Sequence, residues 1–226
     1  IFLYCATAPY SWRCWLSYQS SSDQMILWGR ASSVNVQKVL WALEDCALPY
    51  EHKIVGGIFG GNDDPEFAVL TPVRRVPVLQ DGDITLWESH AILRYLARGQ
   101  ISPITDMWME FGSTTLQPPF IGLFWQQVRM REAEQDKALL KKHIKALHAG
   151  LGILKTGLAD GRTFLAGNDF SMADIAIGSL FHRIMDLHPT ILDTFPKVGE
   201  WHANIATRAG YRKWVATPFD ELRVTE

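Results

Sequence analysis

The spacing of apolar residues changes twice within the first hundred positions. Ile26-Leu27-Trp28 is a short apolar run that Gly29 ends, and it predicts a strand. From Ser33 onwards, apolar residues recur at steps of three and four, as on one face of a helix: Val36, Val39, Leu40 and Leu43. Ser33, or its neighbour Ser32, is well placed as the N-cap of this helix. The polar residues of the same segment are expected mostly outside the apolar face: Gln37, Lys38, Glu44 and Asp45.

A second strand follows the helix. Pro49 ends the helix, and the alternation over 50–55 predicts a strand. Two strands joined by a helix within this length form a parallel β-α-β unit. The loop over 56–61 is glycine-rich but lacks the P-loop lysine and the dinucleotide spacing, so we expect a flexible turn rather than a phosphate site.

A hairpin and a further helix complete the first half of the chain. Asp81-Gly82-Asp83 is a strong turn signal between the apolar runs 78–79 and 84–87. A helix is expected from Ser89, with its inner face formed by Ile92, Tyr95 and Leu96. The order β-α-β and then β-β-α predicts a small mixed sheet with helices packed on it.

The second half of the chain has the spacing of helices. We expect a connector over 100–105, a long helix over 132–158, and a break or kink at Pro118-Pro119. Ser171-Met172-Ala173-Asp174 fits a capping box, flanked by Phe170 and Ile175 as its hydrophobic staple. The predicted domains are therefore 25–99 and 107–226, joined by a linker over 100–106, and each is expected to bury its own core.

Residues 1–24 have neither a helical nor a strand period. They lack the basic start and the unbroken apolar stretch of a signal peptide. We interpret them as a non-native or wrongly extended start. The alternative is a genuine N-terminal arm whose aromatic residues pack on the body of the protein.

Composition narrows the classes of partner. The chain of 226 residues is 47% hydrophobic and 20% charged, with a formal net charge of −2. This balance gives no electrostatic reason to expect nucleic acid or an anionic membrane as the main partner. Three cysteines form neither a disulfide framework nor a metal-ligand pattern, so a reducing cytoplasm is the simplest compartment. No apolar run approaches the length of a membrane span.

Four local strings, in order, resemble one family. These are WGRASSVNVQKVLWALEDCALPYE (28–51), Val76-Pro77, the string Trp87-Glu88-Ser89-His90-Ala91-Ile92, and Phe170-Ser171-Met172-Ala173-Asp174-Ile175. From about Met25 to its end, the chain resembles the glutathione S-transferases, in particular bacterial theta- and zeta-like members of the serine type. The resemblance implies a thioredoxin-like α/β domain followed by an all-helical domain. It also implies glutathione as co-substrate, no metal, a homodimer, and a cis peptide bond before Pro77.

The junction of the first strand and helix carries the expected catalytic chemistry. Glutathione must react as a thiolate, so a transferase needs a donor directed at the sulfur, ideally at the positive end of a helix. Ser33 lies at this junction and matches the serine of theta-, delta- and zeta-type members, although it also fits a plain N-cap. Ser32 is the adjacent alternative, and Asn35 is a candidate second donor. Cys46 is expected to be a small core residue.

The remainder of glutathione needs further partners. Ser89 opens a helix, where backbone amides suit a carboxylate, and Glu88 is an acid for the ammonium group. By resemblance, Val76 and Pro77 hold the cysteinyl peptide in a strand-like pairing, and Lys53 and Arg75 are weaker candidates for the glycine carboxylate. Arg74 stands where the family often has glycine, which implies a loop without a positive φ at this position. His90 is expected on the helix surface.

An apolar pocket for the electrophile is expected between the domains, along the first helix of the second domain. Its candidates are Trp108, Phe111, Leu116, Phe120, Phe124 and Trp125, and Arg129 is either structural or faces the cleft. Three functions remain open from the residues. The favoured one is conjugation of glutathione to small hydrophobic electrophiles, and the others are glutathione-dependent reduction of disulfides or peroxides and a non-catalytic binding role.

Overall fold

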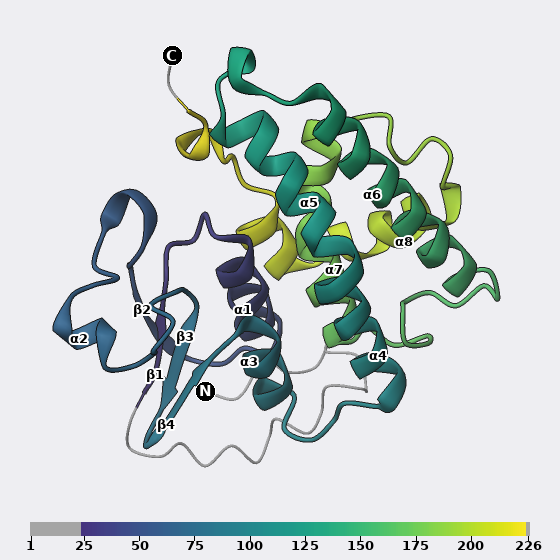
Figure 1. The fold of residues 1–226 in the computed structure, drawn as a ribbon. Helices are drawn as coiled ribbons and strands as arrows, with labels where there is room; N and C mark the ends of the chain where they lie inside the picture. Colours follow the sequence, from purple (N-terminus) through teal and green to yellow (C-terminus); the bar gives the residue numbers. More distant parts are fainter. Residues whose placement is uncertain (1–23, 225–226) are drawn as a thin grey trace.

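The structure is a computed structural model that describes residues 24–224. The interpretation of the N-terminal segment, apart from Gln24, therefore lies outside the described residues. Figure 1 shows the two parts of the chain: a small sheet with its helices, and a larger group of helices that begins with α4.

The first part is a four-stranded mixed sheet with helices packed on it. Its elements are β1 (Met25–Trp28), α1 (Val34–Asp45), β2 (Tyr50–Lys53), α2 (Pro65–Ala68), β3 (Val78–Asp81), β4 (Ile84–Trp87) and α3 (Ser89–Leu96). The strand order is β2-β1-β3-β4, with β1 parallel to β2 and antiparallel to β3. The predicted β-α-β and β-β-α units are thus confirmed. The fold of this part is thioredoxin-like.

The second part is helical throughout. It contains α4 (Pro103–Phe111), α5 (Gln117–Phe124), α6 (Lys137–Gly157), α7 (Met172–Leu187) and α8 (Pro196–Ala206). Single π-helical turns cover Gly112–Leu116, Trp125–Arg129 and Tyr211–Val215, and short 3₁₀ turns cover Gly57–Phe59, Glu132–Glu134 and Asp220–Leu222.

Three helix boundaries differ from or refine the expectations. α4 begins inside the expected connector, because the Ser102 hydroxyl accepts a hydrogen bond from the Thr105 amide and Pro103 fits the first helical position. The long helix begins at Lys137, because Asp136 caps it by accepting from two amides. At Pro118-Pro119 the α-helical pattern is interrupted by the preceding π-helical turn, since prolines offer no N–H to that turn.

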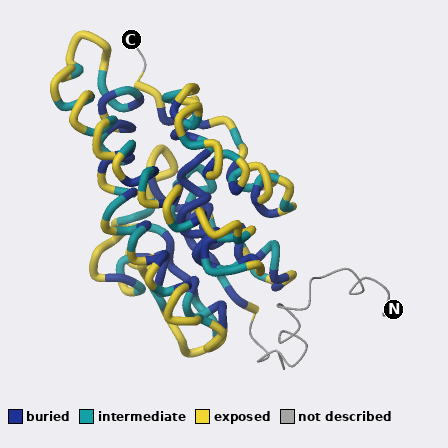
Figure 2. The backbone as a smooth tube through the Cα atoms, turned by 90° about the vertical axis from the view of Figure 1, so that its right-hand side faces the viewer, coloured by how far each residue is buried: buried dark blue, intermediate teal, exposed yellow. Residues whose placement is uncertain are grey.

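Both parts of the chain share one core, which corrects the expectation of two separate cores. α1 and α3 lie between the sheet and the helical part (Figure 1), and one large cluster of buried residues extends from Met25 to Leu222. A second, small cluster belongs to the sheet part alone and consists of Trp28, Val55, Phe67 and Val78. Trp41 of α1 illustrates the contact, because its ring centroid lies 5.6 Å from that of Phe170 and 5.2 Å from that of Tyr211. In Figure 2 the buried segments gather in the middle of the molecule, and the exposed ones lie on loops and outer helix faces. The first helix therefore has protein on nearly all sides.

The capping box at α7 is confirmed. Asp174 accepts hydrogen bonds from the backbone amide and the hydroxyl of Ser171, both at 2.9 Å. It also accepts from the Leu165 amide at 2.9 Å and from the Trp201 indole at 2.8 Å. One buried carboxylate therefore ties the start of α7 to the preceding loop and to α8.

Candidate active site

Ser33 lies where β1 passes into α1. It is the N-cap residue, with extended backbone angles (φ −84°, ψ 123°), and it is half-buried. Its side chain makes no capping hydrogen bond, and within the described part of the chain its hydroxyl has no hydrogen-bond partner. The hydroxyl is therefore available at the positive end of a twelve-residue helix.

Ser32, by contrast, is engaged on two sides. Its hydroxyl accepts a hydrogen bond from Arg30 Nη1 at 2.8 Å, and its carbonyl oxygen accepts one from Arg183 Nη2 at 2.7 Å. Arg183 comes from α7, so the helical part of the chain holds the loop that precedes Ser33. The two serines that the sequence left as alternatives therefore differ in that the hydroxyl of Ser32 is engaged by Arg30, whereas that of Ser33 makes no capping hydrogen bond.

The loop before β3 approaches the same junction. The peptide bond between Val76 and Pro77 is cis, as the resemblance implied. Gly29 allows the approach, because a Cβ added there would lie 3.0 Å from Val76 Cβ and 2.5 Å from a Val36 methyl carbon. Val76 is half-buried, so part of it remains accessible beside the end of β1.

The start of α3 borders a cavity that both parts of the chain enclose. Glu88 is exposed and has a positive φ of 70°, and Ser89 is the buried first residue of α3. The cavity measures about 250 Å³ and is lined from the α3 side by Glu88, Ser89, His90, Ala91 and Arg94, and from the other elements by Asn35, Glu110, Ser113 and Gln117. Backbone amides at the start of α3 and the Glu88 carboxylate thus belong to one concave site.

A buried lysine lies behind this cavity, which corrects the expectation that Lys38 is mostly outside the apolar face. Its side chain is 1% exposed, and its ammonium group is 2.6 Å from Gln117 Oε1, 3.1 Å from Asn35 Oδ1 and 3.3 Å from His90 Nε2. Burial lowers the pKa of Lys38 to about 7, although the Glu88 charge acts in the opposite direction. Gln37 is likewise 1% exposed.

His90 is also buried, contrary to the expectation of a surface position. Its side chain is 8% exposed, and burial, then the charges of Lys38 and Arg94, lower its pKa to about 3. The neutral imidazole therefore faces the Lys38 ammonium. Sequence periodicity missed Lys38 because α1 is covered by other elements on several sides, so its polar side chains have little solvent to face. It missed His90 because α3 packs against α1 there, and the imidazole lies against Lys38.

The Arg74 loop corrects another expectation. Arg74 has a φ of 48°, in the left-handed region, although it is not glycine. Asn62 donates a hydrogen bond to the Arg74 carbonyl at 2.8 Å, and the Arg74 guanidinium donates to Asp63 at 2.8 Å. These contacts compensate the unfavourable backbone angle, so the loop takes the turn that glycine takes more easily.

The two weaker candidates for a glycine carboxylate lie in different surroundings. Lys53 pairs with Glu66 at 3.2 Å, and its ammonium group lies 4.4 Å from the centroid of the Trp28 ring. Arg75 is exposed on the loop that leads to Val76.

The aromatic candidates for the electrophile pocket are mostly packed in the shared core. Trp108 and Phe120 are buried, and Trp108 meets the half-buried Phe111 edge-on at 5.4 Å. Phe124 is also buried, but its ring centroid lies 5.5 Å from the Arg183 guanidinium carbon, near the Ser32 contact. Of these four residues, Phe124 has the direct contact with a residue that touches the Ser32–Ser33 loop.

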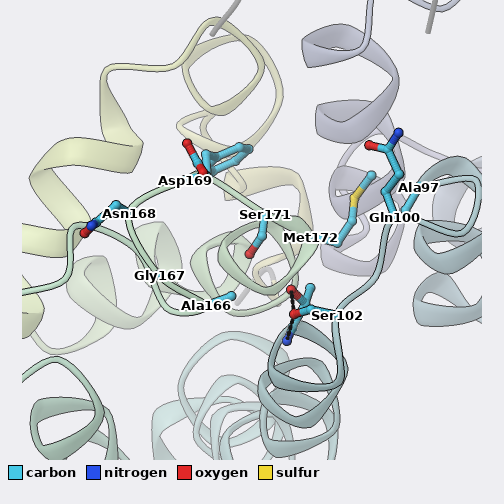
Figure 3. A pocket seen from close by; sticks show the side chains of 11 residues that line it. Ala97, Gln100, Ser102, Ala166, Gly167, Asn168, Asp169, Ser171 and Met172 are labelled. Atoms are coloured by element: carbon cyan, nitrogen blue, oxygen red, sulfur yellow. Dashed lines mark hydrogen bonds between the residues drawn. The ribbon is translucent and has the colours of Figure 1, made fainter. Parts of the chain in front are cut away.

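Another cavity lies at the opposite end of α3. It measures about 210 Å³ and is lined by Ala97 and Gln100, by Ser102 and Thr105 at the start of α4, and by the 166–172 segment (Figure 3). Because Ser89 begins α3 and Ala97 follows its end, this cavity is separate from the site at Ser33 and Ser89.

The fold and the site define a class of protein. A thioredoxin-like sheet whose cis-proline loop meets the start of the first helix, followed by a helical domain, is the architecture that the sequence resemblance implied. Residues 23–98 match the family model of the glutathione S-transferase N-terminal domain, and residues 104–209 match that of the C-terminal domain. The chain belongs to the glutathione S-transferase family.

Individual relatives span the same region. Glutathione S-transferase GstB of Escherichia coli K12 is 35% identical over 205 residues, which cover 85% of this chain and 98% of GstB. Glutathione S-transferase 4 of Zea mays is 29% identical over 201 residues, covering 83% of this chain and 90% of its own. The glutathione-bound theta class enzyme of Xanthomonas axonopodis pv. citri superposes with a TM-score of 0.79 at 35% identity, covering 86% of this chain and 98% of that one.

Residues 24–224 contain neither a cluster of metal-ligating side chains nor a membrane-spanning helix. No group of three or more histidine, cysteine, aspartate or glutamate side chains is gathered there as metal ligands. None of the helices in that range is long and apolar enough to cross a membrane.

Proposed function

We propose that this protein conjugates glutathione to small hydrophobic electrophiles, and that the Ser33 hydroxyl stabilises the glutathione thiolate. The observation that carries the proposal is the unpartnered Ser33 hydroxyl at the start of α1, at a strand–helix junction whose Gly29 lies against Val76 of the cis Val76–Pro77 bond. A hydrogen bond to sulfur at the positive end of a helix favours the thiolate over the thiol. The engaged Ser32 hydroxyl supports Ser33 over its neighbour.

The remaining polar groups are proposed to bind the other parts of the tripeptide. The backbone of Val76, before Pro77, pairs with the cysteinyl unit, and the amides at Ser89 with the Glu88 carboxylate hold the γ-glutamyl end. Lys53 and Arg75 are proposed for the glycine carboxylate. A glutathione-bound relative of similar fold supports the co-substrate.

Asn35 has a supporting position. Its amide oxygen accepts hydrogen bonds from Lys38 at 3.1 Å and from Gln117 at 3.3 Å. The amide nitrogen is then the free end of the side chain, and we assign it as a second donor near the sulfur. The aromatic candidates Trp108, Phe111, Phe120 and Phe124 are proposed to border the electrophile, with Phe124 nearest the reacting end.

The serine assignment is tested with matched variants. Ser33→Ala is expected to lower kcat/KM for an uncharged aryl halide about 100-fold near pH 7, because one donor to a developing anion contributes roughly that factor. It should also raise the pKa seen in the pH–rate profile, since the bound thiol loses its donor. Ser32→Ala is the control, because it removes an adjacent hydroxyl that is already engaged with Arg30. Equal rates for wild type and Ser33→Ala, at unchanged KM for glutathione, would refute the assignment.

The type of reaction and the assembly are tested separately. Faster turnover of a mixed disulfide or a hydroperoxide than of an aryl halide would replace conjugation by reduction. Absence of glutathione binding in calorimetry would leave only a non-catalytic role.

We further propose a cytoplasmic homodimer, supported by Ile58 and Phe59, which are 73% and 54% exposed in the turn after β2. Size-exclusion chromatography with light scattering measures the oligomeric state, and the mass of two chains is expected.

A further inference from the structure

Three arginines from separate elements come together beside the Ser32–Ser33 loop. Arg30 follows β1, Arg129 ends the π-helical turn after α5, and Arg183 lies on α7. Arg30 and Arg183 both donate to Ser32, at 2.8 and 2.7 Å. Arg129 is close enough for its charge to lower the pKa of both other guanidinium groups. The sequence had left the role of Arg129 open.

The charge of this arginine cluster is not balanced by the described residues around it. Within residues 24–224, none of the three arginines forms an ion pair. Glu221, an exposed residue in the last 3₁₀ turn, is the acid whose charge acts on Arg30 and Arg183. Burial, followed by Arg30 and Arg129, lowers the pKa of Arg183 to about 10. The excess of positive charge is therefore held in place at a cost in stability.

Two buried donors in the arginine cluster lack acceptors. Arg183 is 3% exposed, and its Nε has no hydrogen-bond partner among the described residues. The Nε of Arg30 is also buried and has no hydrogen-bond partner among the described residues. Buried donors in folded proteins nearly always have acceptors, so this unmatched pair, in two side chains that hold the Ser32 loop, points to an acceptor supplied by a ligand.

Aromatic rings border the arginine cluster. The guanidinium carbon of Arg183 lies 5.5 Å from the centroid of the Phe124 ring and 5.2 Å from that of Phe219. A purely structural role accounts for part of this arrangement, since Arg183 Nη2 also bonds Gln37 at 3.3 Å and so joins α7 to α1. This structural role does not explain the positive charge of Arg129 or the two unpartnered Nε atoms of Arg30 and Arg183. A ligand with an apolar body and an anionic group matches both the rings and the charges.

We propose that Arg30, Arg129 and Arg183 bind a carboxylate on the electrophile, so that the preferred co-substrates are small electrophiles that carry one. This inference rests on the proposed transferase function and specifies its substrate class. In the reaction, the glutathione thiolate attacks the carbon that bears a halogen, a C–S bond forms, and the halide leaves with the electron pair of the broken bond. The thiol proton passes to water, and the carboxylate of the substrate is unchanged.

A matched pair of substrates tests the proposal with the full-length protein. The pair is 4-chloro-3,5-dinitrobenzoate and its neutral N-methylamide, and each kcat/KM is divided by the rate constant of the uncatalysed reaction with glutathione, because the two para substituents activate the reacting carbon differently. We expect kcat/KM for the carboxylate to exceed that for the amide about tenfold at low salt, with the ratio falling as salt screens the charges. The ratio cancels effects on folding and on glutathione, since both substrates share them.

Variants assign the preference to the arginine cluster. Arg129→Gln is expected to lower the ratio about tenfold, and Arg129→Lys to restore most of it, because the lysine keeps the charge. Glu221→Gln should raise the ratio severalfold, since it removes the competing acid. Arg212→Gln is the control, because it removes an exposed arginine of the turn Tyr211–Val215 and should leave the ratio at the wild-type value.

The possible outcomes test the carboxylate site and the proposed transferase function separately. Conjugation of both substrates at equal kcat/KM, with a ratio insensitive to Arg129→Gln, overturns the carboxylate site while the transferase assignment stands. An Arg129→Gln variant with a raised KM for glutathione and an unchanged ratio also overturns it, because the arginines then serve glutathione itself. Turnover of neither substrate, together with no glutathione binding, refutes the proposed function and this inference with it.

Discussion

Asp174→Asn is expected to destabilise the protein far more than its nearly identical shape suggests. The two carboxylate oxygens each accept two hydrogen bonds. Oδ1 accepts from the Leu165 amide and the Trp201 indole, and Oδ2 accepts from the amide and hydroxyl of Ser171. Asp174 is fully buried, so water cannot replace a lost partner.

The magnitude follows from the number of donors left without an acceptor. An asparagine has one oxygen, so in either orientation its NH₂ group faces two of the four donors, of which the Ser171 hydroxyl alone can turn round and accept from it. One or two buried donors are then left without an acceptor at about 1–3 kcal/mol each, which gives a loss of about 1–6 kcal/mol in the free energy of unfolding. This is a large fraction of the roughly 5–15 kcal/mol that stabilises a typical domain.

Urea unfolding followed by tryptophan fluorescence measures this effect, at one protein concentration so that assembly does not contribute. Asp169→Asn is the matched control, because Asp169 is an exposed aspartate of the same loop and should change stability by about 0.5 kcal/mol or less. Ser171→Ala removes one donor without leaving a new one unmatched, so its cost should be near 1 kcal/mol. If Asp174→Asn costs no more than Asp169→Asn, the reasoning from unmatched donors is wrong.

Two further predictions concern the corrected residues. Burial lowers the pKa of Lys38 from 10.5 to about 7 in the folded protein. Between these two pH values the unfolded chain therefore binds more protons than the folded one. The stability contributed by Lys38 accordingly rises with pH in this range. Wild type should therefore gain about 1.4 kcal/mol per pH unit over Lys38→Met between pH 7.5 and 9 in urea unfolding, and parallel pH profiles would contradict the lowered pKa. At Arg74, a β-branched residue is poorly suited to a φ of 48°, so Arg74→Val should cost about 1–2 kcal/mol in thermal unfolding. Arg74→Gly should stay within about 1 kcal/mol of wild type, and equal losses in both variants would show that the side-chain contact with Asp63, rather than the backbone, stabilises the loop.

Local sequence was sufficient for the elements whose causes are local. The turn at Asp81-Gly82-Asp83, the capping box at Ser171 and the helix that follows Ser33 depend on residues a few positions apart. The expectation of a cis bond before Pro77, which the structure confirms, came from the resemblance to a family. Ser33 was singled out from its place at a strand–helix junction, which is again a local property.

What only the tertiary structure decided depends on segments far apart in the chain. Lys38 and His90 are buried because α1, α3 and α5 meet, and no helical period within one segment contains that information. Arg74 accepts a positive φ because Asn62 and Asp63 bind it from another part of the loop.

The anchoring of the Ser32–Ser33 loop is of the same kind. The Ser32 carbonyl oxygen accepts a hydrogen bond from Arg183, which lies 151 positions later in the chain, whereas the Ser32 hydroxyl is engaged by the nearby Arg30. The sequence by itself thus determined the order of the elements and placed two candidate serines at the strand–helix junction, because hydrophobic spacing and capping act over a few residues. The tertiary structure alone decided which polar groups are buried and paired, because burial and electrostatic interactions depend on distance in space rather than along the chain.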